Sequence, residues 1–432
     1  MQQTKQASKV AIIGGGLTGL TAAIRLAEQG IYCQLFEAAT TLGGRTRSFY
    51  EPTMQQLCDN GPHLLLGAYS ATQKLLKSID ADQHIHWQAS LSLPLWDLQR
   101  GHFSFEPTKK APFALAMLHT IFNMPAHGFS SAIDMLRLAM ALQQAKPPQV
   151  DSVEQWLQQL GIKQALMRDL LEPLCLGAMN QGIETANAHS FKRVLQESFA
   201  DRQQARLGWF TAPLQTALIE PLQLRAEQLG VNITTRHRVR QLTSLNGKIA
   251  VDGTAFDTVI MALPAYAADR LLGQVSHAKT AAINNIHLWL KEKINMPSPF
   301  IGTIGGTGQW YFDISQQWNV NHSAQHICAV ISADTRLLSH KALIERCLSE
   351  LTSLCNLSRQ PQLLHSRVIC EKRATVLVQA QHAHQALREN IIDACERPCP
   401  GELPATIESA IRRGENSAYQ CTSDSSYHCY PL

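Results

Sequence analysis

The chain is 432 residues long and 45% hydrophobic, so it can bury a large core, and its length predicts two or three domains rather than one. Its 38 basic and 34 acidic residues leave a formal net charge of +4 without a basic block, which argues against nucleic acid as a partner. The polar N-terminus and the glycines that interrupt the first apolar run fit neither a signal peptide nor a membrane span, so we expect a cytoplasmic protein.

The first predicted element is a strand from Lys9 that breaks into a glycine-rich turn and continues as a helix. Such a turn needs one glycine to be tight, a second to let backbone approach a pyrophosphate, and a third for close helix–strand packing. The N-terminus of the helix attracts the phosphates. The pattern predicts a Rossmann-type dinucleotide site whose turn consists of Gly14, Gly15, Gly16, Leu17, Thr18 and Gly19.

The next apolar run, Tyr32–Phe36, stops at Glu37, about 20 residues after the turn, as in dinucleotide-binding folds. We expect the carboxylate of Glu37 to hold ribose hydroxyls and to repel a 2′-phosphate, which disfavours NADP. Six residues later comes Gly43-Gly44-Arg45.

With these motifs the chain resembles the FAD-binding amine oxidase and carotenoid desaturase superfamily. The resemblance implies FAD rather than NAD as cofactor, with Arg45 reaching the pyrophosphate, a role that suits a planar and permanently charged donor. The alternative for Arg45 is an ordinary arginine in a surface loop. The resemblance also implies an α/β fold, in which a Rossmann-type, GR2-like FAD-binding domain carries an inserted, discontinuous α+β substrate domain.

We expect the FAD-binding domain in three pieces, at residues 1–94, 209–264 and 371–420, followed by a loose tail at 421–432. The second piece reads as a helix after Pro213 with leucines at 218, 222, 224 and 229, then strands at 231–235, 238–242, 248–251 and 258–262, with a hairpin turn at Asn246-Gly247. By the resemblance, the backbone of Val239 holds the adenine. The alternative is an ordinary strand valine.

The third piece contains a short strand ending at Asp393 and a helix that runs to Ala418. By the resemblance, Asp393 closes on the ribityl and phosphate side, and the helix aims its N-terminus at the flavin pyrimidine, where negative charge collects on reduction. One departure is that Ile392 precedes Asp393 where the family has glycine, and its side chain would weaken FAD binding. The other residues expected near the cofactor here are Leu403, Pro404, Thr406 and Ile407.

The stretches at 95–208 and 265–370 would build the substrate domain. Within them, 113–142 is helix-like and rich in Leu, Met, Phe and Ala, but Pro125 and Gly128 interrupt it and exclude a membrane span. It is either a buried pair of core helices or, in part, the lining of an apolar tunnel or a surface that rests on a membrane.

Five strings in order resemble one branch of the superfamily, the hydroxysqualene dehydroxylases. The resemblance implies that FAD, once reduced, delivers a hydride to hydroxysqualene, which loses its hydroxyl and becomes squalene. It implies a long apolar isoprenoid substrate, an electron donor outside this chain, and peripheral contact with the inner face of the membrane. The strings are 59–69, 172–180, 309–313, 371–375 and 403–408.

Dehydroxylation needs a proton donor, and three acidic or basic groups are candidates. Asp59 and His63 lie in a loop that, by the resemblance, passes near the flavin with Gly61 and Pro62, and Glu172 lies in an apolar string that would raise its pKa. Each has a structural alternative: Asp59 as a turn cap, His63 as a core histidine bonded to backbone, and Glu172 as a partner of Arg193 or Lys192.

Two further groups are open to two interpretations. The Glu371-Lys372-Arg373 run is either a solvated strand edge or part of the domain interface, and Trp310 and Phe312 either stabilise a cation through their π faces or pack in the core. The glycines at 302–308 lead into an aromatic run rather than a helix, so we predict a loop there instead of a second nucleotide site.

The eleven cysteines are scattered without a CxxC pair, so we expect most to be reduced and buried, and no metal site. Cys395 and Cys399 are close in sequence, but Pro398 between them argues against a disulfide.

Alternative functions are a desaturase of a polyprenyl or carotenoid hydrocarbon, a flavin-poor lipid carrier or scaffold, and an amine oxidase proper. The last is disfavoured because the C-terminal region lacks an aromatic pair that would cage an amine.

Overall fold

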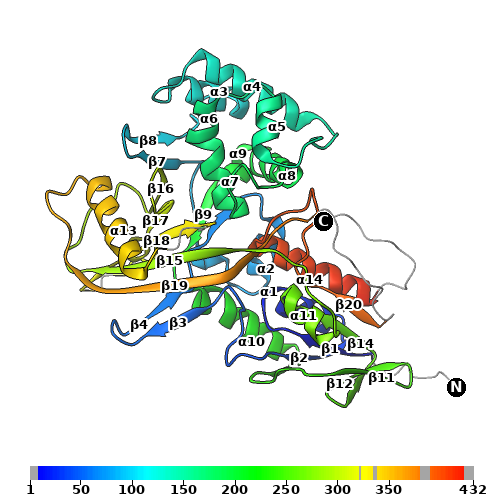
Figure 1. Cartoon of the computed structure of the whole chain (residues 1–432). Helices are drawn as coiled ribbons and strands as arrows, with labels where there is room; N and C mark the ends of the chain where they lie inside the picture. Colours follow the sequence, from blue (N-terminus) through cyan, green and yellow to red (C-terminus); the bar gives the residue numbers. More distant parts are fainter. Residues whose placement is uncertain (1–7, 321–322, 334–337, 380–389, 423–432) are drawn as a thin grey trace.

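The computed structural model describes residues 8–320, 323–333, 338–379 and 390–422. A five-stranded parallel sheet lies at one end of the molecule, in the order β10-β2-β1-β14-β20 (Figure 1). Its strands come from all three predicted pieces of the FAD-binding domain, and their carboxyl ends align because Ile13 pairs with both Phe36 and Met261. The strands are β1 (Lys9–Ile13), β2 (Tyr32–Phe36), β10 (Asn232–Thr234), β14 (Thr258–Met261) and β20 (Ile391–Asp393). The predicted Rossmann-type α/β fold is confirmed.

Helices cover this sheet, and two of them meet closely. The first helix, α1 (Leu17–Ala27), packs against the last, α14 (Ile407–Thr422), where a Cβ on Gly414 would come within 2.7 Å of the Thr21 side chain. This contact brings the N-terminal ends of both helices to the same region of the molecule. The other helices beside the parallel sheet are α2 (Ser70–Ser78), the π-helical η3 (Gln215–Ile219), α10 (Glu220–Gln228) and α11 (Ala265–Leu271).

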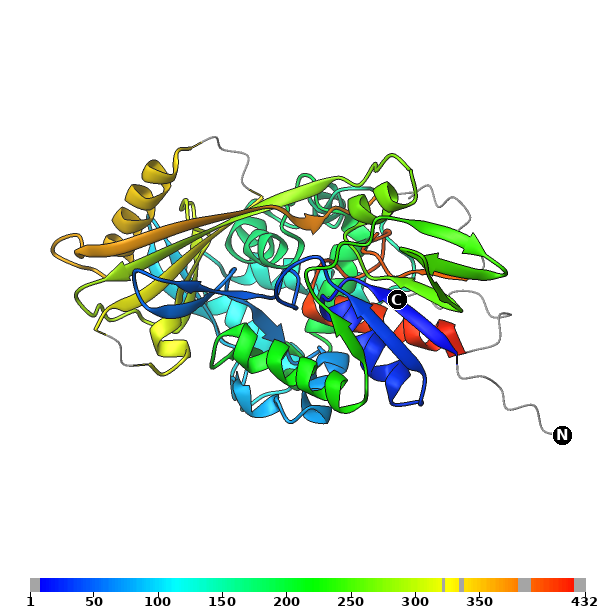
Figure 2. The ribbon, with the colours of Figure 1, turned by 90° about the horizontal axis from the view of Figure 1, so that it is seen from below.

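A second sheet, of seven strands, lies in the other half of the molecule. Its two longest strands run side by side toward the parallel sheet (Figure 2). Only β16 and β7 pair in parallel within it. In spatial order the strands are β19 (Leu363–Val376), β15 (Thr280–Leu290), β18 (Gln325–Ser332), β17 (Trp310–Asp313), β16 (Phe300–Ile304), β7 (Leu93–Asp97) and β8 (Gly101–Phe105).

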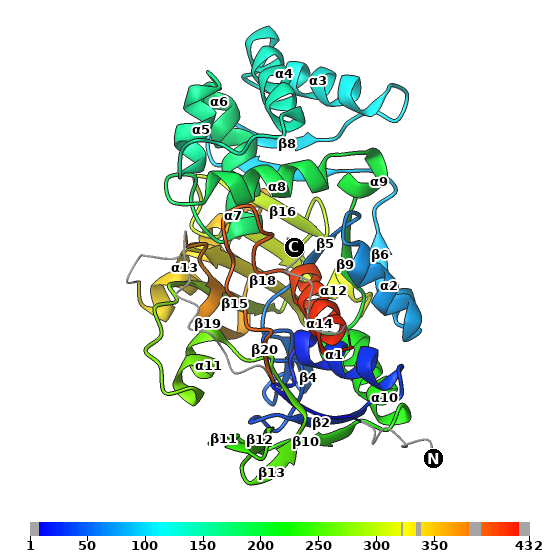
Figure 3. The same ribbon diagram turned by 90° about the vertical axis from the view of Figure 1, so that its right-hand side faces the viewer.

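A helical layer lies beyond this sheet, and α3 and α4 form its outermost part (Figure 3). The predicted interruption at Pro125 and Gly128 is confirmed, since it separates these two helices. A large buried core joins the layer to the sheet through Leu95, Phe105 and Phe300. The helices are α3 (Phe113–Asn123), α4 (Phe129–Gln143), α5 (Val153–Gln159), α6 (Gln164–Leu166), α7 (Glu172–Met179), α8 (Ala188–Ser198) and α9 (Arg202–Ala205), with the π-helical η2 (Met167–Leu171) before α7. No helix among the described residues is both long and apolar enough to cross a bilayer.

The remaining elements are short, apart from the 15-residue helix α13. The predicted turn at Asn246-Gly247 is confirmed, with positive φ at both residues, between two antiparallel strands. The elements are β3 (Ser48–Glu51) with β4 (Gln56–Asp59); β5 (Leu64–Leu66), β9 (Leu207–Phe210) and β6 (Ile85–Trp87); β11 (Leu242–Leu245), β12 (Lys248–Val251) and β13 (Thr254–Phe256); η1 (Asp82–His84), α12 (Ile314–Gln317) and α13 (His340–Leu354).

Several predicted bounds differ from the structure. The predicted strand at 238–242 is wrong, because β11 begins only at Leu242. The backbone N–H groups of Arg240 and Gln241 donate to the carboxylate of Asp252 and so are not available to pair with a neighbouring strand. Strand β19 crosses the predicted boundary at residue 370, and α14 continues to Thr422. The rest of the predicted tail, 423–432, lies outside the described residues.

Candidate active site

A cavity of about 1550 Å³ lies between the carboxyl edge of the parallel sheet and the second sheet with its helices. Pockets for drug-sized ligands measure about 300–1,000 Å³, so this cavity has room for more than one small molecule. One arm begins at the glycine turn, and the other runs among apolar side chains of the substrate half. The two arms form one continuous space.

The residues of the glycine turn have different roles: some are required for packing within the protein, and one leaves space for a ligand. Gly14 has φ of +114°, and a Cβ there would overlap the carbonyl oxygen of Ala262, while a Cβ on Gly19 would overlap that of Gly14. A Cβ on Gly16 would meet no protein atom within 4 Å. Gly14 and Gly19 are therefore required by the protein backbone, whereas Gly16 keeps space open toward the cavity. The turn residues that line the cavity are Gly14, Gly16, Leu17 and Thr18, and Gly15 and Gly19 do not reach it.

Glu37 follows β2 and faces the cavity, as predicted for an acid beside the ribose. Its two carboxylate oxygens accept the backbone N–H groups of Gly15 and Ala39, each at 2.7 Å. These bonds tie the acid to the glycine turn and fix its position. They leave lone pairs on each oxygen for hydroxyl groups of a ligand.

Replacing Glu37 with alanine should weaken FAD binding by about 1–3 kcal/mol, because the ribose hydroxyls and two backbone N–H groups would lose their acceptor. Titration of apo-protein with FAD, followed by flavin fluorescence, measures the change. Glu37→Gln keeps one side-chain oxygen and should lose less. Unchanged FAD affinity in Glu37→Ala would contradict the assignment of this turn.

Arg45 is held by residues from the third piece of the FAD-binding domain. Its guanidinium donates to the carboxylate of Glu396 and to the carbonyl oxygen of Ala374, both at 2.6 Å. The preceding turn positions it, because Gly43 and Gly44 have positive φ and the N–H of Gly43 donates to the carbonyl of Gly15. Arg45 lines the cavity, so it is not a loose surface arginine.

A buried polar cluster beside Arg45 has unused hydrogen-bonding atoms. The Nε atom of Arg413 and the Oε1 atom of Glu396 are buried without a hydrogen-bond partner among the described residues, and both residues line the cavity. The Arg413 guanidinium lies 3.9 Å from Oε1 of Glu396, as a long ion pair. Burial lowers the pKa of Arg413. Because such atoms are costly to leave unpaired, the cluster fits a polar, charged ligand group, which is what the cofactor's pyrophosphate and ribityl chain supply.

The structure does not place Asp393 on the cavity wall. Its carboxylate accepts the Nε–H of Arg397 and the N–H of Cys395. The acid that reaches the cavity is Glu396, three residues later. Ile392 pairs with Ile260 in the sheet and packs against the core beside α1, and it does not line the cavity. The sequence signal for Glu396 is the short segment Ala394-Cys395-Glu396, which leaves the sheet toward α14.

The start of α14 also reaches the cavity. Thr406 and Ser409 cap each other reciprocally, each side-chain oxygen accepting the other's backbone N–H at 3.0 Å. Thr406 and Ile407 line the cavity, but Leu403 and Pro404 do not: Leu403 packs against the helical core. Val239 lines the cavity and belongs to no strand, so the ordinary strand valine is excluded, and its contact with adenine remains a prediction.

Of the three predicted proton donors, the structure brings only His63 to the cavity. It lies there with Gly61 and Pro62, and a Cβ on Gly61 would collide with the Asn285 side chain. Burial and the nearby positive charge of Arg45 lower the pKa of His63 to about 4. At neutral pH its ring is therefore uncharged, with one N–H to donate and one nitrogen to accept.

Asp59 lies away from the cavity and acts as a cap. Its Oδ1 atom accepts the hydroxyl of Ser48 at 2.6 Å and the N–H of Leu214 at 2.9 Å, where η3 begins. The alternative interpretation as a cap therefore fits the structure, although the capped segment is distant in sequence. Burial raises the pKa of Asp59 to about 7.

This pKa has a consequence for stability. The unfolded value for aspartate is about 3.9, so between about pH 4 and 7 the folded protein keeps a proton that the unfolded chain releases. The free energy of unfolding should therefore fall as pH rises through that window. In urea denaturation, wild type should lose on the order of 4 kcal/mol relative to Asp59→Asn between pH 4 and 8. Parallel pH profiles for the two proteins would contradict the raised pKa.

Glu172 begins α7 but does not line the cavity, whereas Pro173, Leu174 and Gly177 do. Burial, with Glu184 and Glu154 nearby, raises its pKa. The alternative of a pair with Lys192 or Arg193 is wrong, because Arg193 binds Glu197 and Lys192 binds backbone carbonyls.

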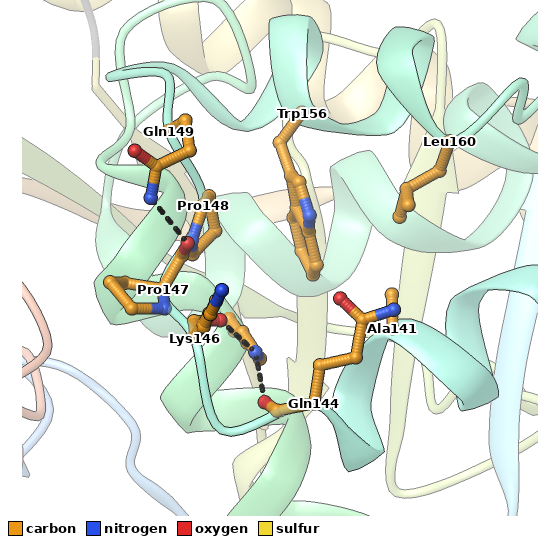
Figure 4. A pocket seen from close by; sticks show the side chains of 9 residues that line it. Ala141, Gln144, Lys146, Pro147, Pro148, Gln149, Trp156 and Leu160 are labelled. Atoms are coloured by element: carbon orange, nitrogen blue, oxygen red, sulfur yellow. Dashed lines mark hydrogen bonds between the residues drawn. The ribbon is translucent and has the colours of Figure 1, made fainter.

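Figure 4 shows a second cavity, of about 370 Å³, at the end of α4, with Gln144, Lys146 and Trp156 on its walls, and Lys192 also lines it. The Lys192 ammonium donates to the carbonyl oxygens of Gln144 at 2.6 Å and Lys146 at 2.8 Å, and burial lowers its pKa. None of the predicted site residues lines this cavity, so we assign the chemistry to the larger one.

The apolar arm of the large cavity contains residues that sequence reasoning missed, because they are single positions on separate strands and helices. Trp310 and Phe312 lie in this arm and are also buried in the helical core, so both proposed uses are compatible. The Nε1–H group of Trp310 is buried without a hydrogen-bond partner among the described residues. The missed apolar residues are Leu91, Leu93, Phe105, Val194, Leu195, Phe199, Leu207 and Val330.

The Glu371–Arg373 run lies between the two halves. Glu371 and Arg373 line the cavity, with the Arg373 guanidinium 4.0 Å from the centre of the Tyr266 ring, while Lys372 is exposed. The interface interpretation therefore applies to two of the three residues. The prediction for the cysteines also holds in the main, since six of the ten described ones are buried, and Cys395 and Cys399 form no disulfide.

Comparison with known proteins agrees with this geometry. The sequence model of the flavin containing amine oxidoreductase family matches residues 17–391. A hydroxysqualene dehydroxylase from Zymomonas mobilis is 26% identical over 94% of this chain and 97% of its own length. A zeta-carotene desaturase from Synechocystis is 24% identical over 58% of this chain and 55% of its own length. The crystal structure of an oxidoreductase from Methanosarcina mazei superposes with a TM-score of 0.73 at 14% identity, over 94% of this chain and 99% of that one.

Proposed function

This chain belongs to the flavin containing amine oxidoreductase family, and we propose that it reductively dehydroxylates hydroxysqualene to squalene. It is an FAD-dependent oxidoreductase. The observation that carries the finer proposal is the continuity of the large cavity, which joins the glycine turn to an arm walled by apolar side chains. Similarity to a hydroxysqualene dehydroxylase over nearly the whole of both chains supports the choice of substrate.

When bound, reduced FAD supplies a hydride. The protein must release the substrate's hydroxyl, protect the resulting allylic cation and exclude water. In the apolar arm, the rings of Trp310 and Phe312 can stabilise positive charge through their π faces.

We assign His63 the role of hydrogen-bond donor to the leaving oxygen, which departs as hydroxide and takes its proton from water. It is the one member of the three predicted donors on the cavity wall. Its neutral ring, a consequence of the lowered pKa, avoids placing a second positive charge beside an allylic cation.

A desaturase of a polyprenyl or carotenoid hydrocarbon is the second candidate, and the partial similarity to zeta-carotene desaturase favours it. It would use the same apolar arm in the opposite redox direction. The flavin-poor lipid carrier loses its support, because Ile392 packs in the core and does not obstruct the cavity.

The test is product analysis under two conditions. Purified holoenzyme is incubated anaerobically with hydroxysqualene and a chemical reductant, and separately with a polyprenyl hydrocarbon and an electron acceptor. We expect squalene in the first incubation and unchanged hydrocarbon in the second. New double bonds in the hydrocarbon, with hydroxysqualene unchanged, would favour the desaturase instead.

A further inference from the structure

Large apolar side chains are exposed on the outermost helices of the substrate half. Fourteen large hydrophobic residues are exposed among the described residues, and five of them lie within 26 positions on α3 and α4. The other nine are spread over the rest of the chain. We call these five the apolar face; they are Leu115, Phe122, Phe129, Leu136 and Met140, with exposed fractions of 47–74%.

The apolar face lies on the outer sides of its helices. Leu115 and Phe122 are seven positions apart on α3, and Phe129, Leu136 and Met140 are spaced by seven and four on α4, so each set shares one side of its helix. The opposite sides carry Ile121, Met135 and Leu138, which are buried in the helical core. The two helices pack against each other at the edge of the molecule (Figure 3). The apolar face therefore points away from the protein.

The exposed charged side chains between residues 108 and 148 are basic, and the exposed acids Glu106 and Asp151 flank this segment. Between residues 108 and 148 the basic side chains are Lys109, Lys110, Arg137 and Lys146, and all four are exposed. The one acid in this segment is Asp134, which is buried and bonded to Arg137 and to the N–H of Lys163. Exposed apolar side chains bordered by basic ones match an interface of hydrocarbon and anionic headgroups.

The same core connects the apolar face to the cavity. Ile121 and Met135 on the inner sides of α3 and α4 share it with Leu91, Leu93 and Phe105, which line the apolar arm. Arg202 of α9 donates to the carbonyl oxygen of Ala111 just before α3, and Ala205 at the end of α9 lines the cavity. The helices are thus fixed to the wall of the proposed substrate site.

We propose that the apolar face of α3 and α4 docks the protein on a bilayer that contains anionic lipids. The proposed function would explain why the protein docks, since a long isoprenoid substrate resides in such a bilayer. The docking proposal itself does not depend on the reaction. The apolar side chains would enter the boundary between headgroups and acyl chains, and the four basic side chains would face phosphate groups.

The test is sedimentation of the full-length holoenzyme with vesicles, without substrate. Wild type should pellet with vesicles of phosphatidylglycerol and phosphatidylcholine, and at least tenfold less with phosphatidylcholine alone. The variant Phe129→Ser/Leu136→Ser should bind the anionic vesicles at least tenfold more weakly, because it removes apolar area that is exposed in the free protein. Lys109→Glu/Lys110→Glu should weaken binding to the anionic vesicles selectively.

The matched control is Leu224→Ser/Leu364→Ser, which removes two leucines of similar exposure from α10 and β19 and should bind as wild type does. All variants should keep their unfolding temperature and their product formation in detergent solution, so a failure of docking is distinguishable from a failure of the proposed reaction. Equal vesicle binding by wild type and Phe129→Ser/Leu136→Ser would overturn the proposal. So would a dimer in gel filtration that this variant dissociates, with no vesicle binding by wild type.

Discussion

Replacing His63 with alanine is expected to lower squalene formation by about 10²–10³-fold while FAD stays bound, which is the usual range for loss of one hydrogen-bond donor to a developing negative charge. The ring lies on the cavity wall beside Leu64, and its pKa of about 4 keeps it neutral at physiological pH. Single-turnover product formation by reduced enzyme measures the loss without interference from product release.

The pH dependence of the His63→Ala defect shows whether the neutral ring or the imidazolium ion of His63 acts in the reaction. A group with a lowered pKa is uncharged above that value, so the N–H of neutral His63 is equally available from pH 5 to 8, and the defect of His63→Ala should be constant across this range. His63→Gln, which retains an N–H donor, should recover part of the activity. A defect that disappears above pH 7 would identify the imidazolium ion as a proton donor, and full turnover by His63→Ala would show that the ring makes no catalytic hydrogen bond to the leaving oxygen.

Replacing Gly16 with alanine is expected to yield a folded protein that loses FAD. The added methyl group meets no protein atom within 4 Å, and Gly16 has φ of −77°, which alanine adopts readily. The methyl group would instead occupy cavity space that the pyrophosphate needs. Overpacking of this kind costs about 1–3 kcal/mol, which corresponds to a loss of affinity of roughly 5–150-fold.

Gly19→Ala is the contrasting variant. Its Cβ would overlap the carbonyl oxygen of Gly14, so the strand and helix must separate and the apo-protein itself should be destabilised. Comparing unfolding temperatures of the two apo-proteins, together with their flavin content, distinguishes a cofactor role from a packing role. Equal destabilisation of both, or retention of FAD by Gly16→Ala, would contradict the division of roles within the turn.

The sequence predicts the FAD half well because its signals are local. Gly14, Glu37 and Arg45 belong to short motifs in which each residue type answers a nearby steric or electrostatic need, and all three line the cavity. The antiparallel turn at Asn246-Gly247 is a signal of the same kind.

The misassigned residues depend on long-range geometry instead. Asp59 and Glu172 stand in strings that suggest a site, but Asp59 caps a segment 155 positions away, and Glu172 does not line the cavity that Pro173 and Leu174 line. Asp393 was the more obvious acid of its strand, yet Arg397 binds it, and the next acid, Glu396, reaches Arg45. Which of two neighbouring side chains faces a cavity depends on the direction in which the strand leaves the sheet.

The apolar arm could not be predicted for a related reason. Its walls come from strands and helices far apart in the chain, each contributing one or two ordinary core residues such as Leu93, Val194 and Val330. No spacing rule links them, because only the packing of the second sheet against the helical layer brings them together.

The most direct test of the proposed reaction is an anaerobic single turnover with stoichiometric reduced enzyme and hydroxysqualene. Absorbance follows the oxidation of the flavin, and gas chromatography follows squalene. We expect one squalene for each flavin oxidised, with no squalene from enzyme whose flavin is oxidised at the start. Flavin that stays reduced beside unchanged hydroxysqualene would contradict the reductive dehydroxylation proposed for this chain.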